Sequence, residues 1–177
     1  MRRVSRVKGP DIAQEQEVIL ERLVQTYQGA LLRTCYLYLR DASQAEDAVQ
    51  ETFLKAYRGL DFFRGESSEK TWLFSIAINT CRDMNRSSWI RHLDRRVTPE
   101  MLPDTPVPFE QKDETLVLAV MELPVRLREV ILLYYYQGMN VKDISAALGI
   151  AQPSVSGRLI RARKQLRRIM ERRESHA

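Results

Sequence analysis

The C-terminal segment carries closely spaced cations along a predicted helix. Its apolar positions recur in steps of three and four and form one buried face: Val155, Leu159, Ala162, Leu166 and Ile169. The outward and flanking positions are Ser154, Gly157, Arg158, Arg161, Lys164, Gln165 and Arg168. Such cations can neutralise DNA phosphates while the helix lies in the major groove. The pattern favours DNA binding over a solvated basic helix. A membrane-surface helix ranks third, because the apolar face has no aromatic anchors.

The sequence has no pattern typical of an enzyme. His92 and His176 have no obvious Cys or Asp partner, and no glycine-rich phosphate-binding loop occurs. Glu46, Asp47 and Glu51 resemble an acidic metal cluster, but no histidine or loop ligand accompanies them. We therefore expect no catalytic residue, no metal site and no cofactor.

Charge is unevenly distributed along the 177 residues. The net charge of +5 divides into +4 for residues 1–10, −5 for residues 11–153 and +6 for residues 154–177. An acidic body with basic ends can bind nucleic acid or an anionic membrane, or can simply be solvated, and charge does not choose among these.

The cysteines and the lengths of the apolar segments indicate the cellular compartment in which the protein is expected. Cys35 and Cys81 form no CxxC motif, which argues against a disulfide framework or a zinc site and predicts a reducing cytoplasm. Both fit apolar helical patterns, so we expect buried thiols; a redox-sensing pair stays open if the helices bring them together. The basic N-terminus precedes no apolar run, and no stretch of 18 apolar residues occurs. We therefore expect neither a secretory signal nor a transmembrane helix.

Helical spacing is common in the sequence and strand-like alternation is scarce, so an all-α fold is predicted. The first half predicts helices at 18–38, 43–58 and 69–86, with a loop at 61–68. Ser43 followed by Glu46 is typical of a capping box at the start of the second helix.

Four of the seven prolines fall within residues 99–108 and exclude a continuous helix there. We predict two small helical domains, at 11–90 and 112–174, joined by a proline-containing linker at 91–111. Each domain is small for a single core, so partners are expected to add stability.

The second domain is predicted to hold four short helices, at about 112–121, 124–137, 140–148 and from 153 onward. Pro124 suits a first helical turn, Asn140 suits an N-cap, and Gly149 suits the positive φ of a tight turn. The last two helices and this turn follow the helix-turn-helix plan.

Two blocks of sequence resemble a known family. The first reads AEDAVQETFLKAY at 45–57, FRGESS at 63–68 and KTWLFSIAIN at 70–79, with Asp83 and Arg86 beyond. It resembles region 2 of bacterial sigma factors of the extracytoplasmic-function (ECF) group. The second block, from Leu123 to Arg167, resembles region 4 of the same group. Their order and separation make the resemblance specific, and it covers about residues 15–172.

The resemblance implies a promoter-recognition subunit of bacterial RNA polymerase. Region 2 would bind the polymerase clamp and open the −10 element, and region 4 would bind the −35 element and the polymerase flap. The implied partners are core RNA polymerase through its beta and beta′ subunits, promoter DNA, and an anti-sigma factor that is often membrane-bound.

By the resemblance, the polymerase-binding residues are Asp47, Gln50, Glu51 and Leu54. They lie largely off the inward stripe of the 43–58 helix, and a polar, partly acidic face suits a protein partner. Composition by itself favours an ordinary solvated face.

The segment 61–86 combines aromatic, amide and cationic side chains, which hold single-stranded bases by stacking and hydrogen bonding. Phe62 and Asn85 are candidates there, and the residues predicted to bind −10 DNA are Phe63, Arg64, Ser67, Lys70, Trp72, Asn79, Arg82 and Arg86. Trp72 suits the core equally well, whereas we expect Phe74 in the core.

The residues predicted to bind −35 DNA are Lys142, Ser154, Ser156, Gly157, Arg158, Ile160, Arg161 and Lys164. The family usually reads Pro-x-Gly-Thr-Val-Lys-Ser-Arg after the turn. Here Pro153 replaces the glycine, Ser156 the basic residue and Gly157 the serine. We expect phosphate anchoring to survive and the preferred −35 bases to differ.

A second hypothesis belongs to a different class. The chain could be a helix-turn-helix regulator that acts without polymerase, with residues 11–90 as a sensory or dimerisation domain. Binding to core polymerase discriminates between the two.

Overall fold

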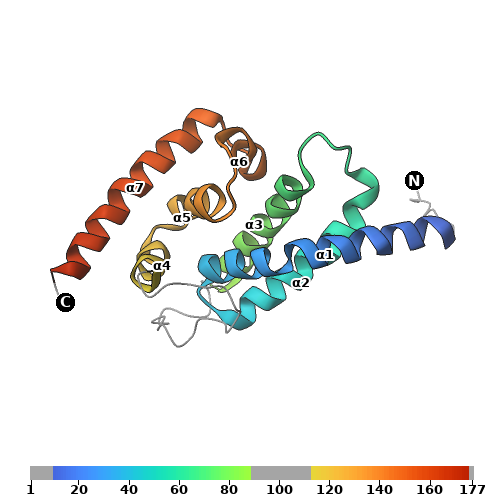
Figure 1. The fold of residues 1–177 in the computed structure, drawn as a ribbon, viewed down its shortest axis with the longest axis horizontal. Helices are drawn as coiled ribbons and strands as arrows, with labels where there is room; N and C mark the ends of the chain where they lie inside the picture. Colours follow the sequence, from blue (N-terminus) through green and yellow to red (C-terminus); the bar gives the residue numbers. More distant parts are fainter. Residues whose placement is uncertain (1–9, 89–112, 176–177) are drawn as a thin grey trace.

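The computed structural model describes residues 10–88 and 113–175, and these contain helices and turns but no strand. The all-α prediction is confirmed. Figure 1 shows the first three helices grouped together and the last four forming a second group. The main helices are α1 (Pro10–Leu39), α2 (Ala42–Gly59), α3 (Glu69–Ser88), α4 (Asp113–Glu122), α5 (Val125–Ile131), α6 (Val141–Leu148) and α7 (Gln152–Glu174).

Helices α1, α2 and α3 pack on one another through the apolar stripes that the sequence predicts. The capping box predicted at Ser43 is wrong, because α2 begins one residue earlier, at Ala42. Asp41 is the N-cap: its backbone is extended and its side chain accepts a hydrogen bond from the Gln44 amide at 3.0 Å. Ser43 therefore lies inside the helix.

The helix predicted over 124–137 consists of two parts. Helix α5 ends at Ile131, and a π-helical turn, Leu132–Tyr136, continues it. Pro124 is the N-cap of α5 and so precedes the first turn in which it was predicted. Asn140 caps α6 as predicted, since its side chain accepts from the Asp143 amide at 2.9 Å. Gly149 ends α6 with φ at 64°.

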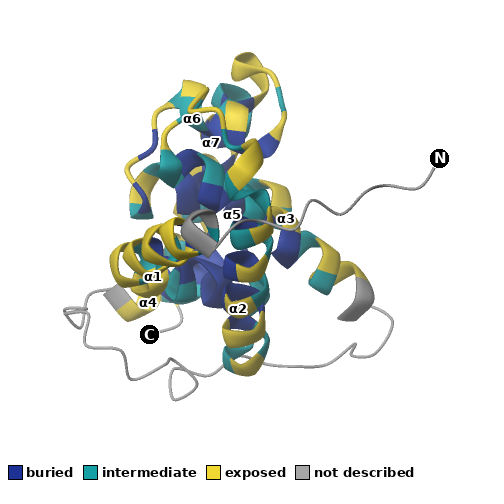
Figure 2. Ribbon diagram, turned by 90° about the vertical axis from the view of Figure 1, so that its right-hand side faces the viewer, coloured by how far each residue is buried: buried dark blue, intermediate teal, exposed yellow. Residues whose placement is uncertain are grey.

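The two helix groups pack against each other. Helix α3 contacts α6, and α1 contacts α4 and α5. Figure 2 shows buried residues running from one group into the other, and the buried side chains form one continuous cluster. Each group thereby covers apolar surface that the other could not bury by itself. The linker at 91–111, the cations of residues 1–9, His92 and His176 lie outside the described residues.

The core resolves two questions that the sequence left open. Phe74 is fully buried, as expected, whereas Trp72 is half-buried. Cys35 and Cys81 are both buried, and a hydrogen bond between their side chains together with burial raises the pKa of the Cys81 thiol. Helices α1 and α3 therefore do bring the two thiols together, but a buried thiol that resists ionisation is a poor nucleophile, so this environment disfavours a redox-sensing role.

The turn before α7 sets the direction of that helix, and Gly149 makes the turn possible. We expect Gly149→Ala to lower the free energy of unfolding by about 1 kcal/mol, because a Cβ is strained at positive φ. The Cβ itself would meet no atom within 4 Å, so the loss measures backbone strain. Urea denaturation followed by circular dichroism checks this.

Gly157→Ala is the matched control, since Gly157 lies within α7 and an added Cβ there also has open space. This variant should raise the free energy of unfolding by up to ~1 kcal/mol through helix propensity. Equal changes in both variants would contradict the role given to the turn.

Candidate nucleic-acid interface

Helix α7 is held in place by the face that it buries. Val155, Leu159, Ala162 and Ile169 are buried, and the helix packs against α4, α5 and α6. Leu166, predicted on the same stripe, is half-buried. The short turn at Gly149 then places α6 and α7 as a helix-turn-helix pair.

The opposite face of α7 points to solvent at most of the predicted −35 positions. Ser154, Ile160, Arg161 and Lys164 are exposed, as is Lys142 on α6, while Ser156 and Gly157 are half-buried. Ile160 is 64% exposed and lies among these polar and cationic side chains. Arg161 Nε donates to the Gly157 carbonyl oxygen at 3.2 Å, so this guanidinium lies along the helix surface.

Four of the predicted −10 residues meet at one cleft. The rings of Phe63 and Trp72 stack with centroids 4.7 Å apart and planes at 28°. With Arg64 and Ser67 they line an open cleft of about 340 Å³, and Phe62, at the same cleft, is 80% exposed. Aromatic faces beside a guanidinium and a hydroxyl suit an unstacked base.

The other four predicted −10 residues lie elsewhere. Asn79 and Arg86 are exposed and lie about two turns apart on α3. Arg82 is on the turn between them, toward the second helix group. Lys70 Nζ donates to the backbone carbonyl of Gln137 in that group. The Gln137 amide in turn donates to Thr34 Oγ1 at 2.9 Å. Lys70 and Arg82 therefore serve contacts between the groups in this structure.

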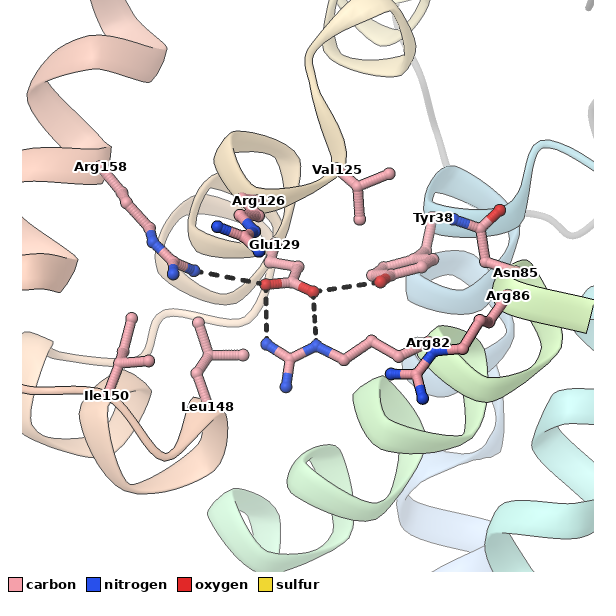
Figure 3. A pocket seen from close by; sticks show the side chains of 10 residues that line it. All are labelled: Tyr38, Arg82, Asn85, Arg86, Val125, Arg126, Glu129, Leu148, Ile150 and Arg158. Atoms are coloured by element: carbon pink, nitrogen blue, oxygen red, sulfur yellow. Dashed lines mark hydrogen bonds and ion pairs between the residues drawn. The ribbon is translucent and has the colours of Figure 1, made fainter. Parts of the chain in front are cut away.

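A single carboxylate, that of Glu129, occupies the centre of this junction (Figure 3). Glu129 is 1% exposed and belongs to α5. Arg82 of α3 donates to it twice, from Nε at 2.7 Å and from Nη2 at 2.9 Å, and the Tyr38 hydroxyl of α1 donates at 3.1 Å. Arg158 Nη1 of α7 lies 3.6 Å away.

The electrostatics around Glu129 keep these donors in their donating forms. The hydrogen bond to Glu129 raises the pKa of Arg82, and burial, followed by the Glu129 charge, raises the pKa of Tyr38. Arg128, the neighbour of Glu129, is also buried, and its Nη1 donates to the Tyr38 carbonyl oxygen at 2.6 Å.

Sequence reasoning missed Glu129. The available signal was its position: adjacent charges at 128 and 129 interrupt the apolar run that continues through Val130 and Ile131. A charged residue at a core position must find a partner, but the partner's identity depends on tertiary packing.

An open cleft of about 680 Å³ lies around Glu129, between the two helix groups. Four arginines line it, Arg82 and Arg86 from α3, Arg126 from α5 and Arg158 from α7, against the single carboxylate. The cleft is therefore strongly cationic.

The predicted polymerase-binding residues share one exposed face of α2. Asp47, Gln50 and Leu54 are exposed, and Leu54 is 51% exposed. Glu51 is half-buried and lies 3.8 Å from Lys55 Nζ. The face therefore combines one exposed apolar side chain with polar and acidic ones.

Two families match consecutive parts of the chain. Residues 23–91 match the family described as Sigma-70 region 2, and residues 113–166 match Sigma-70, region 4. Among the helices of the described residues, none is both long and apolar enough to cross a membrane.

Whole relatives are similar over nearly the full chain. RNA polymerase sigma-H factor of Pseudomonas aeruginosa is 30% identical over 163 residues, covering 84% of each chain. ECF RNA polymerase sigma factor SigL of Mycobacterium tuberculosis is 31% identical over 176 residues, covering 95% of this chain and 97% of SigL.

Two solved structures resemble both helix groups together. CnrH in complex with the cytosolic domain of CnrY has a TM-score of 0.69 and 27% identity, covering 90% of this chain and 92% of that one. The sigma factor RpoE from Bartonella quintana, in complex with the anti-sigma factor NepR, has a TM-score of 0.65 and 26% identity, covering 92% and 98%.

Proposed function

The chain belongs to the ECF group of the sigma-70 family, and from this premise we propose how its residues divide the work of promoter-specific transcription initiation. It binds core RNA polymerase and directs it to promoters through −10 and −35 contacts. The observation that carries this function is the match of both family regions, in order, to the two helix groups of the structure.

We assign residues 11–90 to region 2, 112–174 to region 4 and 91–111 to the linker between them. Helices α1 to α3 and α4 to α7 support these boundaries. The chain acts as an initiation factor without catalysis of its own, and it works in the cytoplasm, where bacterial polymerase meets DNA.

The exposed face of α2 is the proposed polymerase contact. Leu54 supplies an apolar centre, and Asp47, Gln50 and Glu51 supply polar and acidic groups around it. Interfaces combine these features, with an apolar core inside a polar rim.

We expect the purified chain to bind core polymerase and to start transcription at specific promoters, while the free chain binds duplex promoter weakly. Gln50→Ala with Leu54→Ala should weaken core binding roughly tenfold, because it removes the centre of the proposed contact. Fluorescence anisotropy of labelled chain titrated with core measures this.

Val18→Ala is the matched control, since Val18 is 63% exposed on α1 and outside the proposed face. Tight binding to duplex promoter with no binding to core would contradict the sigma-factor function and favour a helix-turn-helix regulator.

The cleft of Phe63, Arg64, Ser67 and Trp72 is the proposed site for an unstacked −10 base. Asn79 lies seven residues after Trp72, on the same side of α3. Its side-chain amide can form hydrogen bonds with a base edge there. Arg86, farther along α3, is placed to follow the strand backbone.

Trp72→Ala combined with Asn79→Ala should block open-complex formation while core binding persists, because the variant removes a stacking surface and a base-edge amide. A permanganate footprint of the melted region checks this with holoenzyme. An unchanged footprint would show that the −10 assignment is wrong, and lost core binding would show that the variant has damaged the fold.

The exposed side of α7 is the proposed −35 reader. Arg161 and Lys164 supply cations, and Ile160 offers an apolar contact of the kind that suits a thymine methyl group. The half-buried Ser156 and Gly157 carry short side chains where the family usually has longer ones. Base preference then rests on Ile160 and Arg161.

Arg161→Ala should lower transcription from a promoter with both elements roughly tenfold, the loss expected for one arginine contact to a base. A template with a pre-melted −10 region and no −35 element should be nearly unaffected. Run-off transcription with holoenzyme provides the measurement.

Arg167→Ala is the matched control, because Arg167 is an exposed arginine of α7 outside the −35 set. Equal losses on the two templates, or equal losses for Arg161→Ala and Arg167→Ala, would refute the assignment of Arg161.

Regulation by an anti-sigma factor completes the proposal. The two solved neighbours are sigma factors in complexes, one with the cytosolic domain of CnrY and one with the anti-sigma factor NepR. Both cover at least 90% of this chain, so their likeness extends over regions 2 and 4 in one packed arrangement. This supports a closed, inhibited state of the same general shape.

A further inference from the structure

The loop that carries the proposed −10 cleft connects the end of α2 to the start of α3. It begins in a 3₁₀ turn, η1 (Leu60–Phe62), and ends at Ser68, the residue before α3. Ser68 Oγ accepts a hydrogen bond from the Thr71 amide at 3.0 Å, which satisfies an amide of the first turn of α3. Because both ends of the loop belong to defined turns, the shape of the loop depends on how these ends are placed relative to each other.

Helix α1 bonds to both ends of this loop. Gln16 donates to Asp61 Oδ1, at the beginning of the loop. Arg22 donates to Glu69, immediately after the loop, from Nη1 at 2.9 Å and from Nη2 at 2.5 Å. Gln16 and Arg22 lie within two turns of one helix, so a single element holds the loop at its beginning and at its end. We call these two contacts the α1 clamp.

The two contacts of the α1 clamp differ in environment. Gln16 is 5% exposed, whereas the side chains of Arg22 and Glu69 are 51% and 37% exposed. An exposed ion pair contributes little to overall stability, but a two-pronged pair of arginine and carboxylate imposes one geometry. The hydrogen bond from Arg22 lowers the pKa of Glu69, so the pair stays charged at neutral pH. The clamp is therefore suited to orienting the loop more than to stabilising the fold.

The α1 clamp adjoins the aromatic pair of the proposed −10 cleft. Phe63 and Trp72 line that cleft and also line a second cavity, of about 330 Å³. The four clamp residues line this second cavity as well, together with the apolar side chains of Ile19, Leu23 and Leu60. The clamp and the stacked rings thus share one cavity, so a change in the clamp reaches the rings directly.

We propose that Arg22 and Gln16 are positioning residues for base capture at the −10 element: by bonding both ends of the loop to α1, they hold the cleft in the arrangement that receives an unstacked base. Neither residue lines the cleft itself. Ordering the loop before the base arrives lowers the entropic cost of capture. This inference rests on the proposed function of the cleft, but the effect of the clamp on the loop is a property of the chain without polymerase.

Order in the loop can be measured by hydrogen exchange in the full chain without polymerase. The reporters are the amides of Phe63 and Thr71, each of which is hydrogen-bonded at one end of the loop. Arg22→Gln should speed their exchange roughly threefold, because an exposed ion pair that restrains the loop is lost. The Gln44 amide, which is hydrogen-bonded at the start of α2, should exchange at an unchanged rate.

Base capture can be measured as the rate of open-complex formation by holoenzyme on two templates. One carries an intact −10 element, and the other has an abasic site at the −10 position whose loss most slows the wild-type holoenzyme. Arg22→Gln should slow the rate roughly threefold on the intact template and leave it unchanged on the abasic one, because a positioning residue acts only through the captured base. Arg173→Gln is the matched control, since Arg173 forms a partly exposed ion pair with Glu122 within region 4.

Exchanging the two charges tests whether the ion pair itself is responsible. Arg22→Glu should slow open-complex formation at least as much as Arg22→Gln, because it places two carboxylates side by side. Combining Arg22→Glu with Glu69→Arg restores a pair of opposite charges and should recover most of the rate on the intact template.

Faster exchange in the loop, slowing confined to the intact template and recovery by the exchanged pair would together establish the positioning role. Unchanged exchange, equal slowing on both templates, or no recovery would overturn it. If no abasic site in the −10 element slows the wild-type holoenzyme, the proposed function of the cleft is wrong instead. The hydrogen-exchange result would still decide whether the α1 clamp orders the loop.

Discussion

The buried carboxylate of Glu129 is the constraint on which the arrangement of the two regions depends. It lies where α1, α3, α5 and α7 converge, and donors reach it from both sides of the junction. Apolar packing between α1 and the helices of region 4 brings the groups together, but such packing tolerates sliding. A carboxylate held by a two-pronged guanidinium and a hydroxyl requires one alignment, so the polar centre makes the closed state specific.

This specificity has a consequence for an initiation factor. The surfaces proposed to read DNA are built by stable local packing: α7 by its buried stripe and the proposed −10 cleft by the stacked rings of Phe63 and Trp72. In this structure, the contacts around Glu129 fix the position of one surface relative to the other. A buried ion pair suits a reversible junction. When the surfaces separate, hydration of the two charged groups offsets much of the interaction energy that the pair loses.

The local structure was largely predictable from sequence. The periodic apolar stripes gave three helices in region 2 and the helix-turn-helix of region 4, and Asn140 and Gly149 marked the ends of α6 correctly. The capping box at Ser43 failed because Asp41, two residues earlier, competes for the same role. The site residues split similarly: four of the −10 set meet at one cleft, whereas Lys70 and Arg82 turn toward region 4.

The sequence by itself determined the family, the helices and the outward basic face of α7, because these depend on motifs and on repeats of three and four residues. Only the tertiary structure decided which charges meet. Tyr38 and Glu129 are 91 residues apart in the chain, and Arg82 and Glu129 are 47 apart. No local pattern encodes such pairs, since a side chain's electrostatic partner depends on how distant helices pack. Arg82, which the sequence predicts to bind DNA, instead forms hydrogen bonds in the folded chain with Glu129 of the other region.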